Sequence, residues 1–276
     1  MSDKIPLAGV IGAPISHSQS PKLHGYWLKR YGIKGHYVPL HIEQMDLKEA
    51  LQTLPKMGFV GANVTIPHKE TVLGLADIVT DRAALIGAAN TLIFRPDGKL
   101  YADNTDGYGF VENLRTSAKW DPTSGPAAVL GAGGAARAVI ASLLEVGVPE
   151  IRLSNRTRMR SDVLRSEFGT KVVVCEWVNA ADMLDGVATL VNTTSLGMVG
   201  QPELKLSLDR LNPKAVVTDI VYTPLRTGFL KRAAEMGCQT VDGLGMLLHQ
   251  AAPGFERWFG RRPDVDEATR NFILST

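Results

Sequence analysis

Short apolar segments alternate with stretches of helical periodicity along the first hundred residues. Three apolar runs of strand length come first, over Leu7–Ile11, Tyr37–Leu40 and Val60–Ile66. Two more, Thr91–Phe94 and Lys99–Ala102, flank a Pro-Asp-Gly turn at 96–98 and predict a hairpin. Strands separated by helical stretches are typical of an α/β domain.

Helices are predicted between these strands. Apolar residues recur at every fourth position after Ser20-Pro21, so Ser20 is the expected N-cap of the first helix. The spacing of Asp46 and Glu49 resembles a capping box and predicts a second helix. A third is expected over Lys69–Asp77.

The second half of the chain reads as a run of βα units. The strongest domain-boundary signal in the chain, Asp121–Pro126, precedes it. The predicted strands are Ala127–Leu130, Ile151–Asn155, Val172–Cys175, Thr189–Thr193 and Ala215–Val221, and the predicted helices are Ala135–Val146, Ser161–Phe168, Leu244–Phe259 and Asp266–Leu274. Short connections between strands and helices favour a doubly wound parallel sheet. We therefore expect two α/β domains with a cleft between them.

Composition narrows the class of protein. The 276 residues carry 30 Lys plus Arg against 28 Asp plus Glu, a net charge of +2, so a nucleic-acid partner is not expected. The most apolar stretch, Ala127–Val148, is interrupted by Arg137 and Glu145, and no membrane span or signal peptide is predicted. Two isolated cysteines favour neither a disulfide framework nor a zinc site, and a cytoplasmic location fits.

A dinucleotide-binding motif follows the strand at 127–130. Gly131, Gly133 and Ala136 form a G-x-G-x-x-A pattern that opens a helix. The first glycine allows a tight turn, the second allows the backbone to approach a pyrophosphate, and the alanine allows the helix to pack closely on the strand. The alternative is a glycine-rich turn that only packs.

The end of the next strand indicates which dinucleotide binds. The sequence there is Asn155-Arg156-Thr157, with Arg160 four residues after Arg156, and no acidic residue is present to hold a ribose 2′-hydroxyl. Guanidinium groups bind a 2′-phosphate, so NADP is favoured over NAD. The alternative is a solvated helix face, which fits Arg158 best.

Three short polar clusters lie outside the nucleotide-binding half. They occupy residues 16–21, 63–69 and 103–107, and they contain serines, a lysine just after a strand, and two carboxylates. Each has an ordinary structural reading: Ser20 as an N-cap, Asn104 and Asp106 as turn formers, and Lys69 as a surface charge.

Together with the nucleotide motifs, these clusters resemble one family from end to end. The matching segments are S-H-S-x-S-P at 16–21, N-V-T-x-P-x-K at 63–69, G-A-x-N-T at 87–91, D-N-T-D-G at 103–107, G-A-G-G-A at 131–135, N-R-T-x-x-R at 155–160 and D-G-L-G-M-L at 242–247. The chain resembles the shikimate dehydrogenase family. The resemblance implies a substrate-binding domain of residues 1–105 plus 243–276 and a Rossmann-like NADP-binding domain of residues 106–242, with the C-terminal helices returning to the first domain.

The resemblance also implies an activity and a set of site residues. The activity is the NADPH-dependent reversible reduction of 3-dehydroshikimate to shikimate, in chorismate and aromatic amino-acid biosynthesis, by a monomer or homodimer without a metal. Lys69 and Asp106 would form the catalytic pair. Substrate would be held by Ser18, Ser20, Thr65, Asn90, Asp106, Tyr222 and Gln250. NADP(H) would be held by Gly131, Gly133, Gly134, Ala135, Asn155, Arg156, Thr157, Arg160, Ile220, Gly243 and Asp81.

Two positions depart from the family's usual pattern. His68 stands where an aromatic or aliphatic residue is common, and Asn192-Thr-Thr-Ser195 replaces the commoner Asn-Ala-Thr-Ser. Neither departure removes a functional group. His17, His68 and His249 remain alternative acid–base groups, whereas His24, His36 and His41 are expected to be structural.

Three other functions stay open on the sequence. The first is a quinate/shikimate dehydrogenase of broader range that could use NAD. The second is a non-catalytic NADP-binding regulatory module, which the retained Lys69 and Asp106 disfavour. The third is a dehydrogenase with the same nucleotide domain and another substrate, which the motifs of the first domain disfavour.

Overall fold

The chain divides into two compact units. The computed structural model describes residues 5–275, and one unit contains the chain up to Thr105 together with the segment from Leu248 onward, while the other is Asp106–Leu247. The sequence prediction set the second boundary at 242/243, whereas the units divide at 247/248, inside helix α8 (Leu244–Phe259). The loop at 121–126 lies within the second unit and marks no boundary.

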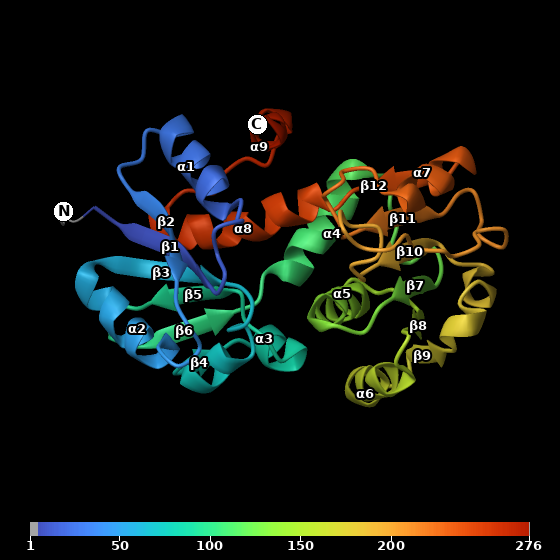
Figure 1. The fold of residues 1–276 in the computed structure, drawn as a ribbon, viewed down its shortest axis with the longest axis horizontal. Helices are drawn as coiled ribbons and strands as arrows, with labels where there is room; N and C mark the ends of the chain where they lie inside the picture. The colour runs from blue at the N-terminus through green and yellow to red at the C-terminus, as the bar shows by residue number, and fades with distance from the viewer. Residues whose placement is uncertain (1–4, 276) are drawn as a thin grey trace. The chain divides into compact units, whose positions relative to one another are not determined.

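The first unit is built on a mixed six-stranded sheet with the strand order β2-β1-β3-β5-β6-β4 (Figure 1). The strands are β1 (Leu7–Gly12), β2 (His36–His41), β3 (Phe59–Val64), β4 (Ile78–Val79), β5 (Thr91–Phe94) and β6 (Leu100–Asp103). Strands β2, β1 and β3 are parallel, and the predicted hairpin β5–β6 joins them antiparallel to β3. The tight Pro-Asp-Gly turn makes β5 and β6 antiparallel, because so short a turn can only connect antiparallel neighbours.

Helices cover both faces of this sheet. The helices of the first unit are α1 (Ser20–Arg30), α2 (Leu47–Thr53), α3 (Asp81–Ile86), the part of α8 from Leu248 onward, and α9 (Glu267–Leu274). Leu47 and Leu51 of α2 pack with the apolar side chains of β1 and β3 on one face. On the other face α1 and α8 form an aromatic cluster in which Trp27 contacts Phe255 edge to face.

The second unit contains an all-parallel sheet with the order β12-β11-β10-β7-β8-β9. Its strands are β7 (Ala127–Leu130), β8 (Ile151–Ser154), β9 (Val172–Cys175), β10 (Thr189–Asn192), β11 (Val216–Asp219) and β12 (Gln239–Val241). The chain builds outward from β7 in one direction through β8 and β9, then in the other through β10 to β12. This is the doubly wound order of dinucleotide-binding folds, and it confirms the predicted fold class.

Two apolar clusters hold the helices against this sheet. The helices of the second unit are α4 (Asp106–Ser117), α5 (Gly134–Glu145), α6 (Arg158–Phe168) and α7 (Gly228–Glu235). The cluster on one face contains Phe110 of α4, Ile140 of α5 and Leu164 of α6. The cluster on the other face contains Leu184 and Phe229. Because both faces are covered, the strands read as continuous apolar runs rather than as alternating ones.

Several local predictions were wrong. Asp46 precedes α2 but makes no capping hydrogen bond, so the capping box does not form. Ser20 is the first residue of α1 rather than its N-cap, which is Gln19. The predicted helix at Lys69–Asp77 is only a short 3₁₀ segment, Thr71–Leu75. The two capping signals are weak, because a capping preference is worth only about 1 kcal/mol and does not by itself fix where a helix begins.

Candidate functional site

The polar motifs of the first unit meet at one edge of its sheet. The strand register pairs Val10 with Asn63, Asn63 with Thr91, and Thr91 with Asp103. These four residues therefore form one row across β1, β3, β5 and β6. The loops that follow β1, β3 and β6, and the loop that precedes β5, all leave the sheet at this edge, and they carry the three polar clusters.

Asn90 is the centre of this edge. Its side-chain oxygen accepts hydrogen bonds from the Thr91 hydroxyl at 2.9 Å and from the Thr105 amide nitrogen at 2.9 Å. Its side-chain nitrogen donates to Oε1 of Gln250, 3.2 Å away. Asn90 is buried, with 3% of its surface exposed. The structure thus brings together two predicted substrate-binding residues that are 160 positions apart in the chain.

The predicted catalytic residues are both tied to Asn90 through the backbone. The Lys69 carbonyl accepts a hydrogen bond of 2.8 Å from the amide of Ala89, the residue before Asn90. Asp106 is the residue after Thr105, whose amide is held by the Asn90 side chain. Lys69 and Asp106 are each half-buried.

The remaining substrate-binding candidates of this unit follow β1 and β3. The Ser18 hydroxyl oxygen accepts a hydrogen bond of 3.3 Å from the Ser20 amide, at the start of α1. Thr65 lies after β3, and its amide donates to the Ile11 carbonyl at 2.9 Å. A Cβ atom on Gly12 would lie 2.6 Å from the Thr65 methyl group, so the two loops are in contact. The serine and threonine loops therefore belong to the same edge as Asn90.

Asp103 fixes the polar loop that leads to Asp106. Its carboxylate accepts hydrogen bonds from the Thr80 hydroxyl at 2.8 Å and the Asn104 amide at 2.7 Å, and it forms a bidentate pair with the Arg82 guanidinium. Burial acts to raise the pKa of Asp103, but the hydrogen bonds from Arg82 and Thr80 outweigh it, and the pKa is lowered. Asp103 is therefore ionised at neutral pH.

The glycine turn of the second unit has the geometry that a dinucleotide requires. Gly131 has a φ of +105°, a left-handed conformation that favours glycine, and its amide donates to the Ser154 carbonyl at 2.8 Å. Cβ atoms on Gly133 or Gly134 would meet nothing within 4 Å. The turn thus leaves open space at the N-terminus of α5, where free amides and the helix dipole favour a phosphate.

The turn lies at the point where the strand order reverses. Strands β7 and β10 are neighbours, yet their following loops turn to opposite sides of the sheet. The Thr193 hydroxyl, which is one of the two departures from the family pattern, donates to the Leu130 carbonyl at 2.7 Å. A Cβ atom on Gly131 would lie 2.7 Å from this hydroxyl. Thr193 therefore supports the glycine turn from the β10 side.

The arginines after β8 divide into two kinds. Arg158 pairs with Asp162 and Glu176, and this explains it as part of a solvated helix face. Arg156 and Arg160 are exposed, and among the described residues neither side chain forms an ion pair or hydrogen bond. Asn155 donates to the Thr157 carbonyl at 2.9 Å, and Thr157 precedes α6 without a side-chain cap. The exposed guanidinium groups of Arg156 and Arg160 are hydrogen-bond donors of the kind that fits a 2′-phosphate.

Two further cofactor candidates, Ile220 and Gly243, come together in the loops that follow β11 and β12. A Cβ atom on Gly243 would lie 2.2 Å from the Ile220 carbonyl oxygen, so any other residue at 243 requires the backbone of this loop to move. Tyr222 follows in the same loop as Ile220 and is 38% exposed. Tyr222 belongs to the second unit although the other substrate candidates, Asp106 apart, lie in the first. Conversely, Asp81 begins α3 of the first unit, whereas the other cofactor candidates belong to the second unit.

Comparisons with known proteins identify a family. A family model described as the shikimate dehydrogenase substrate binding domain matches residues 10–92, and one described as the shikimate 5′-dehydrogenase C-terminal domain matches residues 243–270. A shikimate dehydrogenase (NADP(+)) of Cereibacter sphaeroides is 71% identical over 273 residues, which cover 99% of this chain and 98% of the relative. The chain belongs to the shikimate dehydrogenase family.

Solved structures extend the comparison. Shikimate 5-dehydrogenase from Thermus thermophilus, in complex with NADP(H) and shikimate, is 35% identical with a TM-score of 0.85, over 97% of this chain and 99% of that chain. Quinate dehydrogenase from Corynebacterium glutamicum, in complex with NAD, is 29% identical with a TM-score of 0.91, over 99% of this chain and 100% of that chain. One fold thus serves both substrates and both cofactors.

The histidines take mostly structural positions. His68 is fully buried, and its Nε2 atom lies 2.7 Å from the Ile42 carbonyl, which can only accept a hydrogen bond. This contact fixes the Nε2–H tautomer and ties the loop after β3 to the loop after β2. His24 is also fully buried, and its ring stacks on Tyr37 with centroids 3.9 Å apart. His17 is exposed and His249 is half-buried.

Sequence reasoning missed some residues that shape this edge. The Tyr37 hydroxyl donates to Oδ1 of Asn63 at 2.7 Å, and Nδ2 of Asn63 donates to the Asn90 carbonyl at 3.0 Å. The Thr105 hydroxyl donates to the Gln250 carbonyl at 2.9 Å. Asn63 and Thr105 lie inside the motifs at 63–69 and 103–107, so the sequence contained a signal for both. Tyr37 lies in a predicted strand, and no motif marks it as a site residue.

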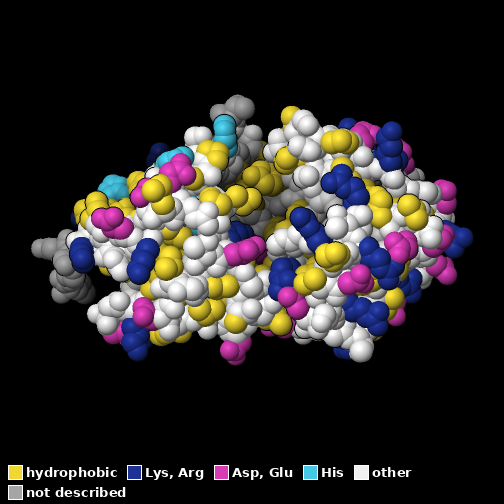
Figure 2. Space-filling model, turned by 60° about the horizontal axis from the view of Figure 1, so that its bottom comes forward, with side chains coloured by type: hydrophobic (Ala, Val, Ile, Leu, Met, Phe, Trp, Pro, Cys, Tyr) yellow, Lys and Arg dark blue, Asp and Glu magenta, His cyan; other side chains and the backbone are white. Residues whose placement is uncertain are grey.

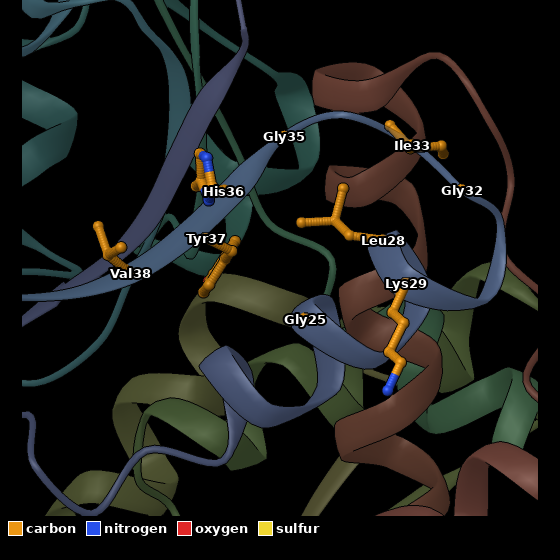
Figure 3. A pocket seen from close by; sticks show the side chains of 9 residues that line it. All are labelled: Gly25, Leu28, Lys29, Gly32, Ile33, Gly35, His36, Tyr37 and Val38. Carbon is orange, nitrogen blue, oxygen red and sulfur yellow. The ribbon is translucent and has the colours of Figure 1, made fainter.

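A separate groove lies between α1 and β2 and has a volume of about 430 Å³ (Figure 3). Its lining residues are Gly25, Leu28, Lys29, Gly32, Ile33, Gly35, His36, Tyr37 and Val38. None of them is a predicted site residue. The polar side chains among its lining residues are those of Lys29, His36 and Tyr37.

Figure 2 shows Lys and Arg side chains interspersed with Asp and Glu on the face in view. Within residues 5–275 no three His, Cys, Asp or Glu side chains gather as metal ligands. None of the helices in the described part of the chain has the length and apolar character to cross a membrane.

Proposed function

We propose that this chain is an enzyme that catalyses the NADP-dependent, reversible interconversion of 3-dehydroshikimate and shikimate. The proposal rests on the family, on relatives named for this activity and on the two halves of the site. The first unit offers a polar edge around Asn90. The second offers a glycine turn and two arginines that have no partner among residues 5–275.

The groups at the Asn90 edge suit a small polyhydroxylated carboxylate. Ser18, Ser20, Thr65, Asn90 and Gln250 are neutral and can both donate and accept hydrogen bonds. Tyr222 would add a phenol. A substrate without matching hydroxyls would leave buried polar groups of this edge unsatisfied, which costs about 1–3 kcal/mol per group. Selectivity for shikimate would come from this penalty.

Lys69 and Asp106 would carry the proton. Reduction of a ring ketone adds a hydride to the carbonyl carbon and places negative charge on its oxygen. The Lys69 ammonium would give a proton to that oxygen as general acid, and the neutral amine would take it back as general base in the oxidation. The Asp106 carboxylate would orient the ammonium and accept a hydrogen bond from a neighbouring substrate hydroxyl.

The second unit would bind the cofactor. The nicotinamide supplies or accepts the hydride when NADP(H) is bound. Gly131, Gly133, Gly134 and Ala135 would hold the pyrophosphate at the start of α5, and Asn155, Arg156, Thr157 and Arg160 would hold the 2′-phosphate. Ile220, Gly243 and Asp81 would line the nicotinamide end.

One observation carries the proposal: the Asn90 side chain joins the segment of Asp106 and the segment of Gln250, while its backbone neighbour holds Lys69. A reaction that transfers a hydride and a proton needs its polar groups fixed before the substrate arrives. The hydrogen bonds of Asn90 provide that fixation for the substrate side. We also propose that the enzyme acts in the cytoplasm, as a monomer or homodimer, without nucleic-acid partners.

The test is one set of rate measurements. NADP⁺ and NAD⁺ reduction is followed with shikimate and with quinate, for the unmodified chain, Lys69→Ala and the control Lys99→Ala, which removes an exposed lysine from the β5–β6 turn. We expect strong NADP⁺ reduction with shikimate, and a loss of about a hundredfold or more in Lys69→Ala only. Equal rates with quinate and NAD⁺ would favour the broader quinate/shikimate enzyme. No turnover of either substrate, with NADP⁺ still bound, would favour a regulatory module.

A further inference from the structure

A carboxylate is fully buried at the end of strand β11. Asp219 is 0% exposed and accepts three hydrogen bonds, from Nδ2 of Asn192 at 3.0 Å, from the Val221 amide at 3.0 Å and from the Thr227 hydroxyl at 2.8 Å. All three partners are neutral. No family motif and no step of the proposed mechanism uses this side chain.

The charge of Asp219 has no counter-ion. In the described part of the chain no Lys, Arg or His forms an ion pair with it. Burial raises its pKa, and the hydrogen bonds from Val221, Thr227 and Asn192 oppose that rise. The two groups that can only donate both meet Oδ1, and the Thr227 hydroxyl donates to Oδ2, so each carboxylate oxygen accepts at least one hydrogen bond. Its negative charge is therefore held by dipoles alone, in surroundings that screen it weakly.

Asp219 also connects the loops of the proposed nicotinamide end. Asn192 ends β10, and its Oδ1 atom accepts hydrogen bonds from the Thr194 amide at 3.0 Å and hydroxyl at 2.7 Å. The Val221 amide belongs to the loop of Ile220 and Tyr222. The Ile220 amide donates to the Asn192 carbonyl at 3.1 Å. Ile220 is the residue after Asp219. A ligand that contacts Ile220 therefore touches the chain next to the buried carboxylate.

We propose that the buried carboxylate of Asp219 sets the preference of the cofactor site for the oxidised over the reduced dinucleotide. The inference rests on the proposed function, since it requires that the site bind NADP(H). The two cofactor forms share every phosphate and differ by one positive charge on the nicotinamide ring. A fixed negative charge behind the Ile220 loop attracts only the oxidised ring. Asp219 would act without touching the cofactor.

The experiment compares the dissociation constants of NADP⁺ and NADPH, measured by calorimetry, for the unmodified chain and Asp219→Asn. The amide keeps the shape of the carboxyl group and an oxygen for Asn192 and Val221, and it removes the charge. We expect the ratio of the dissociation constant of NADP⁺ to that of NADPH to rise by roughly fivefold in the variant. This is the effect expected from removing one charge that acts at an effective dielectric constant of about 20 or more. If Asp219 acted only through its shape, the variant would bind NADP⁺ and NADPH more weakly by the same factor.

Thr193→Ala is the matched control, because it removes a hydrogen bond at the same sheet edge without changing charge. It should leave the ratio of the two dissociation constants unchanged. If Asp219→Asn does not fold, Asp219→Ser removes the charge and leaves room for a water among the three donors. An unchanged ratio in the folded variant overturns the inference alone. Failure of the unmodified chain to bind either form overturns the proposed function as well.

Discussion

The side-chain amides of Asn90 and Gln250 form a hydrogen bond of 3.2 Å, Nδ2 of Asn90 to Oε1 of Gln250. Asn90 immediately precedes strand β5, and Gln250 lies in helix α8. The chain from Leu248 onward belongs to the first unit, and its return places Gln250 beside Asn90. The substrate edge is therefore complete only when the last helices are in place.

Loss of Gln250 should weaken substrate binding. Gln250→Ala removes a proposed substrate contact and also the oxygen that accepts from the buried Asn90 amide, and the loss of such an acceptor costs about 1–3 kcal/mol. We expect KM for shikimate to rise by roughly tenfold or more, with the affinity for NADP⁺ unchanged, in steady-state kinetics. Gln52→Ala, an exposed glutamine of α2, should change neither. An unaltered KM in the Gln250 variant would remove that residue from the substrate site.

Arg156 and Arg160 should decide the choice of cofactor. Neither side chain has a partner among the described residues, so each can bind a 2′-phosphate. The double variant Arg156→Ala with Arg160→Ala should lose NADP⁺ affinity by roughly a hundredfold while NAD⁺ affinity changes little. The control Arg158→Ala removes an arginine already paired with Glu176. Calorimetric titration of both cofactors is the measurement, and a parallel loss of NAD⁺ affinity would contradict the assignment.

His24 should make the fold sensitive to acid. Burial lowers its pKa from 6.5 to about 3, and the nearby Asn63 only partly opposes this. Between these values the unfolded chain binds a proton that the folded chain does not, so the free energy of unfolding falls as the pH drops below 6.5. We expect a loss of about 1 kcal/mol between pH 7 and 5.5 from this group, measured by urea unfolding.

His24→Phe provides the comparison for that measurement. The phenyl ring retains the stacking on Tyr37 and removes two buried nitrogen atoms that have no hydrogen-bond partner among the described residues. The variant should be at least as stable as the parent at pH 7 and should lose less stability at pH 5.5. The control His36→Gln changes an exposed histidine and should keep the full dependence. Identical pH profiles for parent and His24→Phe would contradict the prediction.

Gly243→Ala should disrupt the proposed nicotinamide end. The added Cβ atom would lie 2.2 Å from the Ile220 carbonyl oxygen, a backbone atom that can yield only if the whole loop moves. We expect NADP⁺ affinity to fall by roughly tenfold or more and the free energy of unfolding to fall by about 1–3 kcal/mol. Gly25→Ala in α1 meets nothing within 4 Å and should stabilise the chain slightly. Equal effects of the two substitutions would contradict the steric argument.

Much of the fold could be predicted because its signals are local. The strand at 127–130, the hairpin at 91–103 and the helices after Leu244 each depend on a few neighbouring residues. Boundaries failed where the only local signal was a weak capping preference, as at Ser20 and Asp46. Helix α4 gave no clear pattern, because its buried face includes Gly107, Gly109 and Asn113 beside apolar residues.

The sequence by itself determined the alternation of strands and helices, the glycine turn and the types of residue available for chemistry, because each is written in a short stretch of chain. Only the tertiary structure decided which of them work together. It paired Arg158 with Glu176, joined Asn90 to Gln250 and, within residues 5–275, buried Asp219 without a counter-ion. These relationships depend on strand register and on the return of α8, and both arise from packing between segments far apart in the chain.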